Sequence, residues 1–200
     1  MSTFDDLRGN LASFMERDDF TDADYQLSIR MMESDVNARL RTREMVKRVT
    51  LQSQDGVLTL PDDFNVVRFI KPHNSPLGNL QYTPLEHLER TERVLGQPYA
   101  YALEGQTVRL WPEPKDPSQF TLVYYAKLPA LSATNQSNWL IHEHPQVYLY
   151  GVATHLYGVF DDPREAKAQA RFETALTHII RDSIDGQYGA DVRPAPRSAP

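Results

Sequence analysis

The chain has 200 residues, of which 40% are hydrophobic and 24% are charged, and its formal net charge is −6. This size and composition are typical of a soluble globular protein with one domain, or one domain carrying a smaller insertion. The acidic balance argues against the chain as a whole binding nucleic acid through phosphates. Because cysteine is absent, disulfides, thiolate nucleophiles and cysteine-ligated metals are excluded.

The sequence gives no sign of a membrane partner or of export. No apolar run approaches the roughly 20 residues that a transmembrane helix needs. The first residues, MSTFDDLRGNL, are acidic and amphipathic, unlike a secretory signal. We therefore expect a protein made in the reducing cytoplasm of its host.

The first 43 residues carry the pattern of two helices. Ser2 or Thr3 is suited to cap the first. The apolar stripe of this helix contains Phe4, Leu7, Leu11 and either Phe14 or Met15. Thr21 caps the second helix, and Asp24 completes an aspartate version of the capping box. The buried face of the second helix is predicted to contain Tyr25, Ile29, Met32, Val36 and Leu40.

Residues 44–130 change to short β-rich runs separated by turns. Asp55-Gly56, between runs 49–51 and 57–60, predicts a hairpin. Glu104-Gly105 predicts a second hairpin between runs 99–103 and 108–111. Further β-rich runs lie at 66–70, 81–82 and 120–126, and a short helix is expected within 84–91. We expect an inserted module of antiparallel strands joined by hairpins.

Helical patterns resume near Asn135 or Ser137. Pro145 begins a helix expected to run to Phe160, and this helix is apolar nearly all round. Such a helix lies at the centre of a bundle or against a neighbouring subunit, and Gly151 permits another helix to approach it closely. Asp162-Pro163 begins the last helix, which Gly186 and Gly189 are expected to break.

Together these patterns predict an α+β fold. Residues 1–43 and 131–185 should form a helical bundle, and residues 44–130 an inserted antiparallel β-rich module. Residues 186–200 are rich in proline and should be extended or disordered in isolation.

The triplet His142-Glu143-His144 is the strongest candidate for a metal or catalytic site. Catalytic zinc typically has three protein ligands, and His155 would be the third if a turn brought both imidazoles together. The H-E-x-x-H spacing that places two histidines on one helical face is absent. The alternative is a pair of partly exposed histidines at a helix junction. We expect no metal and no cofactor; the enzymatic hypothesis is a small metal-dependent hydrolase that uses this triplet.

Charges of opposite sign gather in the N-terminal region. The acidic cluster consists of Asp18, Asp19, Asp22 and Asp24, and a second acidic pair is Asp161-Asp162. Both lie where helices begin, so capping and the helix dipole account for them. The basic run consists of Arg39, Arg41, Arg43, Lys47 and Arg48. A helix end and a solvated strand explain this run, and so does contact with an acidic partner subunit.

Four stretches occur in an order and spacing typical of one family. They are LPDDF (60–64), PYAYALEGQTVRLWPEP (98–114), LVYYAKLPALS (122–132) and NWLIHEHPQVYLYG (138–151). In these stretches the chain resembles the phage adaptor family, the head-to-tail connector or neck proteins of tailed bacteriophages. The N-terminal helices match that family only in type.

The resemblance implies a structural protein with no catalytic residues. Such proteins form a ring, commonly of twelve copies, beneath the portal protein of a filled capsid. They join it to tail or nozzle proteins in the virion neck and help retain the DNA that passes through the lumen. The C-terminal segment often reaches the portal, which here points to Val192, Arg193, Pro194, Pro196 and Arg197.

A ring is built from heterologous contacts, in which two different patches on each subunit meet. We therefore expect the acidic cluster at 18–24 and the arginines of the basic run, Arg39, Arg41 and Arg43, to supply part of one such contact.

Overall fold

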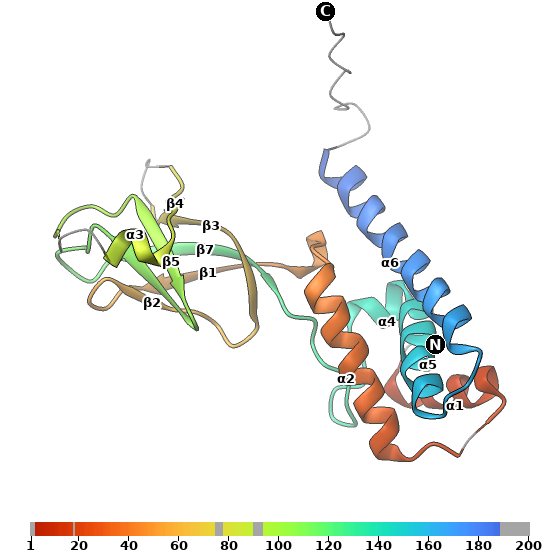
Figure 1. The fold of residues 1–200 in the computed structure, drawn as a ribbon. Coiled ribbons are helices and arrows are strands. Elements are labelled where there is room, and N and C mark those ends of the chain that lie inside the picture. The colour runs from red at the N-terminus through yellow and green to blue at the C-terminus, as the bar shows by residue number, and fades with distance from the viewer. Residues whose placement is uncertain (1–2, 18, 75–77, 90–93, 189–200) are drawn as a thin grey trace, which may run out of the picture. The chain divides into compact units, whose positions relative to one another are not determined.

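The computed structural model describes the chain except for residues 1–2, 18, 75–77, 90–93 and 189–200, and for 185–188 it describes the backbone alone. The chain divides into two units, one formed by residues 1–44 with 128–200 and the other by residues 45–127. The first unit is helical and the second holds the strands (Figure 1). The predicted α+β class is confirmed.

In its described part, the helical unit has five α-helices, which are α1 (Phe4–Met15), α2 (Asp22–Arg39), α4 (Trp139–Glu143), α5 (Pro145–Val159) and α6 (Glu165–Tyr188). Both predicted N-terminal caps are present. The Thr3 hydroxyl accepts a hydrogen bond from the Asp6 N–H at 3.1 Å. Thr21 and Asp24 exchange side-chain and backbone bonds in a full capping box at the start of α2. These caps satisfy N–H groups that have no partner within the helix.

Helix α5 is the centre of this unit, as the sequence predicted. It contacts α1, α2, α4 and α6 (Figure 1), and its buried residues include Val147, Tyr148 and Leu156. Gly151 permits the close approach. A Cβ atom at this position would collide with the Met32 side chain of α2 and lie 2.8 Å from Cε2 of Phe172 of α6.

Buried hydrogen bonds hold the segment that leads from the strands back to the helices. Asn37 and Glu33, one turn apart on α2, accept the backbone N–H groups of Leu128 (2.7 Å) and Leu131 (2.8 Å). The Tyr148 hydroxyl also donates to Glu33, at 2.8 Å. Asn138 donates to the Tyr148 hydroxyl at 2.7 Å and accepts the Ile141 N–H as the N-cap of α4. Burial raises the pKa of Glu33, although both bonds to its carboxylate oppose this rise.

The β-rich unit contains two sheets. One has the order β1-β7-β3, formed by β1 (Val46–Gln52), β7 (Gln119–Ala126) and β3 (Phe64–Pro72). The other has the order β2-β6-β5-β4, formed by β2 (Val57–Thr59), β6 (Thr107–Trp111), β5 (Ala100–Glu104) and β4 (Gln81–Tyr82). A short 3-10 helix, Arg43–Met45, leads into β1, and α3 (Leu85–Glu89) follows β4. One core joins the sheets and includes Ile70, Leu110 and Leu122.

Three expectations about this architecture are wrong. The hairpin at Asp55-Gly56 does not pair β1 with β2. The turn is present, with positive φ at both residues, but β1 pairs with β7 and β2 with β6. Strand β4 runs parallel to β5, so the module is not wholly antiparallel. Helix α6 continues through Gly186 to Tyr188, because a single glycine lowers helix stability by only about 1 kcal/mol.

Candidate functional site

The histidine triplet lies at the junction of two helices. His142 and Glu143 are exposed at the end of α4, and His144 separates α4 from α5. His155 lies further along α5, with Nε2 3.6 Å from Oδ2 of Asp35 on α2. Among the residues that the structure describes, no three His, Cys, Asp or Glu side chains are grouped as metal ligands. His155 therefore does not complete a ligand set with the triplet.

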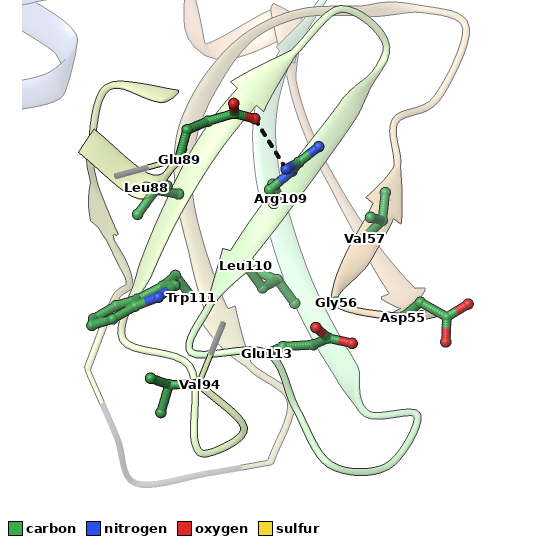
Figure 2. A pocket seen from close by; sticks show the side chains of 10 residues that line it. All are labelled: Asp55, Gly56, Val57, Leu88, Glu89, Val94, Arg109, Leu110, Trp111 and Glu113. Carbon is green, nitrogen blue, oxygen red and sulfur yellow. Dashed lines mark hydrogen bonds and ion pairs between the residues drawn. The ribbon is translucent and has the colours of Figure 1, made fainter. Parts of the chain in front are cut away.

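A hollow of about 470 Å³ lies on the β-rich unit beside β6, α3 and the 55–57 turn (Figure 2). Arg109 and Glu89 form an ion pair on its wall at 3.3 Å, and Arg109 also donates to Glu104 at 2.8 Å. Leu88, Val94 and Trp111 supply apolar surface. Its described lining has carboxylates but no histidine, lysine, serine or threonine.

The predicted basic contact residues have partners inside the chain. Arg39 of α2 forms a two-pronged ion pair with Glu173 of α6, with one bond at 2.8 Å. Arg41 donates to backbone carbonyls at the end of α2, including that of Asn37 at 2.8 Å. Arg43 pairs with Glu44 at 2.5 Å. These bonds stabilise the helical unit, and a contact with a second subunit stays a prediction.

The predicted acidic contact residues are divided between three roles. Asp19 binds Arg17 through two bonds of 2.7 Å, Asp22 pairs with Arg8, and Asp24 completes the α2 capping box. Hydrogen bonds from Arg17 and from Thr21 lower the pKa values of Asp19 and Asp24 respectively. Asp18 lies outside the described residues.

The fold brings the two acidic clusters of the sequence together at one end of the helical unit. Arg17, which follows α1, packs on the Phe160 ring at 3.8 Å and reaches to 4.0 Å from Asp162. Arg164 binds Asp162 and donates to the Met15 carbonyl at 3.1 Å. Hydrogen bonds from Arg164 lower the pKa of Asp162 to about 2.

Three further carboxylates at this end, Glu16, Asp161 and Glu165, are exposed and form no ion pair with any residue that the structure describes. We call the surface formed by Glu16, Asp19, Asp161, Asp162 and Glu165 the acidic end.

A basic surface that the sequence analysis missed covers the β1-β7-β3 sheet. The face turned away from the core carries Val46, Arg48, Thr50 and Gln52 of β1, Gln119, Thr121, Val123 and Tyr125 of β7, and Val66, Arg68, Phe69 and Lys71 of β3. It has three permanent cations and no carboxylate. We call Arg48, Arg68 and Lys71, with the Val123 and Tyr125 side chains between them, the basic face.

Strand alternation alone would have placed Arg48 and Lys71 on the outer face. Arg68 was harder to place, because the register shifts between Val67 and Phe69, which adds one residue to β3. The guanidinium lies 5.9 Å from the centre of the Tyr125 ring, and this contact fixes its side of the sheet.

The formal charge is divided unequally between the two units. Residues 45–127 contain nine basic and nine acidic side chains, so the β-rich unit is formally neutral. The helical unit therefore carries the whole charge of −6. Within the neutral unit, the basic face gathers three of the nine cations on one side of one sheet.

A family model described as SU10 adaptor protein matches residues 2–197, almost the whole chain. The chain belongs to the SU10 adaptor protein family. This is a phage adaptor family, so the resemblance seen in the sequence is confirmed. No curated protein matches the chain.

Membership in the SU10 adaptor family makes the chain a structural adaptor of a bacteriophage, a virion component that contacts other head or tail proteins. The family match reaches the predicted portal-binding residues Val192, Arg193, Pro194, Pro196 and Arg197, which lie outside the described residues. None of the helices in the described part of the adaptor is long and apolar enough to cross a membrane.

Proposed function

We propose that this adaptor forms a ring of twelve copies in the virion neck. The ring joins the portal protein to tail or nozzle proteins and helps retain the packaged DNA that passes through its lumen. The family match over residues 2–197 carries this proposal. An adaptor of this kind acts by binding and shape, so its working parts are surfaces and its role needs no catalytic group.

Charged groups on the chain fit the demands of such a ring. Each subunit must offer two different patches that meet head to tail. The acidic end and the basic face lie on different units and have opposite sign. The predicted pairing of Asp18, Asp19, Asp22 and Asp24 with Arg39, Arg41 and Arg43 is a second route to such a contact.

The C-terminal segment is the proposed portal contact. Arg193 and Arg197 alternate with prolines in VRPAPRSAP, and proline-rich segments favour an extended form that gains order on binding. Carboxylates on the portal would be suitable partners for the two arginines.

Electron microscopy of the purified chain mixed with the matching portal ring tests this function. We expect portal particles capped by a second ring. A chain truncated after Tyr188 should keep its thermal unfolding midpoint and lose portal binding. Portal particles that remain uncapped at saturating concentrations of the full chain would contradict the adaptor ring. Normal capping by the truncated chain would contradict only the role of the C-terminal segment.

A further inference from the structure

The cations of the basic face are not compensated by described carboxylates of the same chain, in contrast to six arginines elsewhere. Arg8, Arg17, Arg39, Arg43, Arg109 and Arg164 each form an ion pair with a carboxylate. Arg48, Arg68 and Lys71 form none with the residues that the structure describes. Arg48 on β1 and the two cations on β3 lie on either side of β7, so three like charges share one face of the sheet with no carboxylate between them.

The surroundings of these cations have the composition of a protein interface. Val66 is 37% exposed, and Phe69 and Tyr125 are half-buried beside it. Arginine, aromatic and apolar side chains together are typical of contact surfaces between proteins. The cations supply attraction to an anionic partner, and the accessible parts of Val66, Phe69 and Tyr125 supply apolar area.

Local charge makes a second copy of the chain a suitable partner for the basic face. The net charge of −6 opposes the approach of any anionic molecule at long range, whether DNA or another copy. A second copy, however, presents a helical unit that carries all of its net negative charge, separate from its own basic face. At short range the exposed carboxylates of that unit complement the basic face of a neighbouring subunit.

The acidic end is the part of the helical unit that best matches the basic face. Its carboxylates follow α1, lie in the α5–α6 turn or belong to α6, yet they lie together because Arg17 and Arg164 hold Asp162 against the end of α1. Those two arginines are already engaged, whereas Glu16, Asp161 and Glu165 are exposed and available.

We propose that the basic face of one subunit binds the acidic end of the next, and that this contact closes the ring. The inference rests on the proposed ring function and names the two surfaces that build it. Because the two surfaces differ and lie on different units, the contact is heterologous and repeats from copy to copy.

Charge reversal on the basic face is the first test. The triple variant Arg48→Glu, Arg68→Glu, Lys71→Glu, mixed with portal rings, should lose at least tenfold in the yield of capped particles. The matched control is Arg30→Glu, Lys115→Glu, Arg181→Glu. It makes the same change in net charge at exposed cations outside the basic face and should assemble like the wild type. Circular dichroism of both variants checks that each is folded.

Reversal of the acidic end provides a rescue. Glu16→Lys, Asp161→Lys, Glu165→Lys should assemble poorly alone and should restore the yield when mixed with the basic-face variant. In the mixture, the reversed basic face of one variant meets the reversed acidic end of the other. The intact basic face of the second variant meets the intact acidic end of the first.

Site-specific cross-linking tests the contact directly, because the natural chain has no cysteine. Chains with Thr50→Cys on the basic face and Asp161→Cys at the acidic end should give a ladder of covalent multimers with a bismaleimide in the presence of portal rings. Either single-cysteine chain should give no product beyond a dimer.

The outcomes separate this inference from the ring function itself. Wild-type capping together with unchanged capping by the basic-face variant would overturn the contact and leave the ring intact. The contact would also be overturned if the basic-face variant lost capping but was not rescued and the two-cysteine chain gave no cross-linked ladder. Binding of duplex DNA that depends on Arg48, Arg68 and Lys71, together with a ring yield that does not depend on them, would overturn it as well. Failure of the wild type to cap portal rings would instead contradict the proposed function.

Discussion

Gly151 is the residue at which α2, α5 and α6 come closest together. A Cβ atom there would overlap the Met32 side chain and crowd the Phe172 ring. Overpacking of this kind in a well-packed core typically costs about 1–3 kcal/mol. We therefore expect Gly151→Ala to lower the free energy of unfolding by about that amount in urea denaturation.

Gly158 in the same helix is the control for this substitution. A Cβ atom there would lie 3.5 Å from the nearest side-chain atom, on Glu165, which is ordinary contact. Gly158→Ala should leave stability unchanged or raise it by up to about 1 kcal/mol, because alanine favours the helix. Equal losses for the two variants would contradict the role of the close approach at Gly151, because of the two positions only that one lacks room for a Cβ atom.

Glu33 gives the helical unit a specific response to pH. Burial raises the pKa of this carboxyl above its usual range, so the folded state binds the proton more tightly than the unfolded state. The stability gained from protonation is present at low pH and is lost as pH rises through the raised pKa.

The substitution Glu33→Gln removes the titration and keeps an oxygen for the Leu131 and Tyr148 donors. Across about pH 4 to pH 8, the wild type should lose stability relative to the variant as pH rises. Urea unfolding at a series of pH values measures this, and a constant difference between the two proteins would contradict it.

At the scale of elements, local signals predicted the helices, the strand positions and the Glu104-Gly105 hairpin, but not the partners of every strand. Thr3, Thr21 and the apolar stripe of α2 act within a few residues, so sequence spacing alone identifies them. Strand partners depend on the whole fold. Asp55-Gly56 does form a turn, but the chain leaves it in a different sheet, and β1 pairs with β7 some seventy residues away in sequence.

The short helix α4 depends on Asn138 more than a surface helix depends on its cap. The Asn138 side chain caps Ile141 and also donates to the Pro129 carbonyl and the Tyr148 hydroxyl, at 2.8 and 2.7 Å. Asn138→Ala removes the cap and leaves buried polar groups without partners, so we expect a loss of about 2–4 kcal/mol.

Thr3→Ala provides the comparison, because Thr3 makes the capping bond of α1 to the Asp6 N–H. Thr3→Ala should lower the free energy of unfolding by about 1 kcal/mol. Thermal and urea unfolding of both variants measure the two losses, and a Thr3→Ala loss as large as that of Asn138→Ala would show that the buried network adds nothing to the cap.

At the scale of the whole molecule, the net charge of −6 conceals an uneven distribution. The sequence shows which residues are charged, and capping explains several of them, but it does not show which cations are compensated. The sequence shows Arg39, Arg41 and Arg43 as a basic run without visible partners. In the fold, Arg39 pairs with Glu173, Arg41 donates to backbone carbonyls, and Arg43 pairs with Glu44. Arg48 is separated in sequence from Arg68 and Lys71 and shares a face with them only because β1 and β3 flank β7.

This distribution predicts how ring assembly responds to salt. The Debye length falls from about 10 Å at 0.1 M salt to about 3 Å at 1 M, so a contact between the acidic end and the basic face should weaken over this range. We expect the yield of capped portal particles to fall several-fold in sodium chloride, as counted by electron microscopy. Contacts made by the exposed apolar side chains of α2, Leu27 and Met31, both 47% exposed, would not weaken in this way. The basic-face variant is the control, and its residual assembly should be much less sensitive to salt than that of the wild type. Equal salt sensitivity of the two proteins would show that the salt-dependent contact lies elsewhere on the chain.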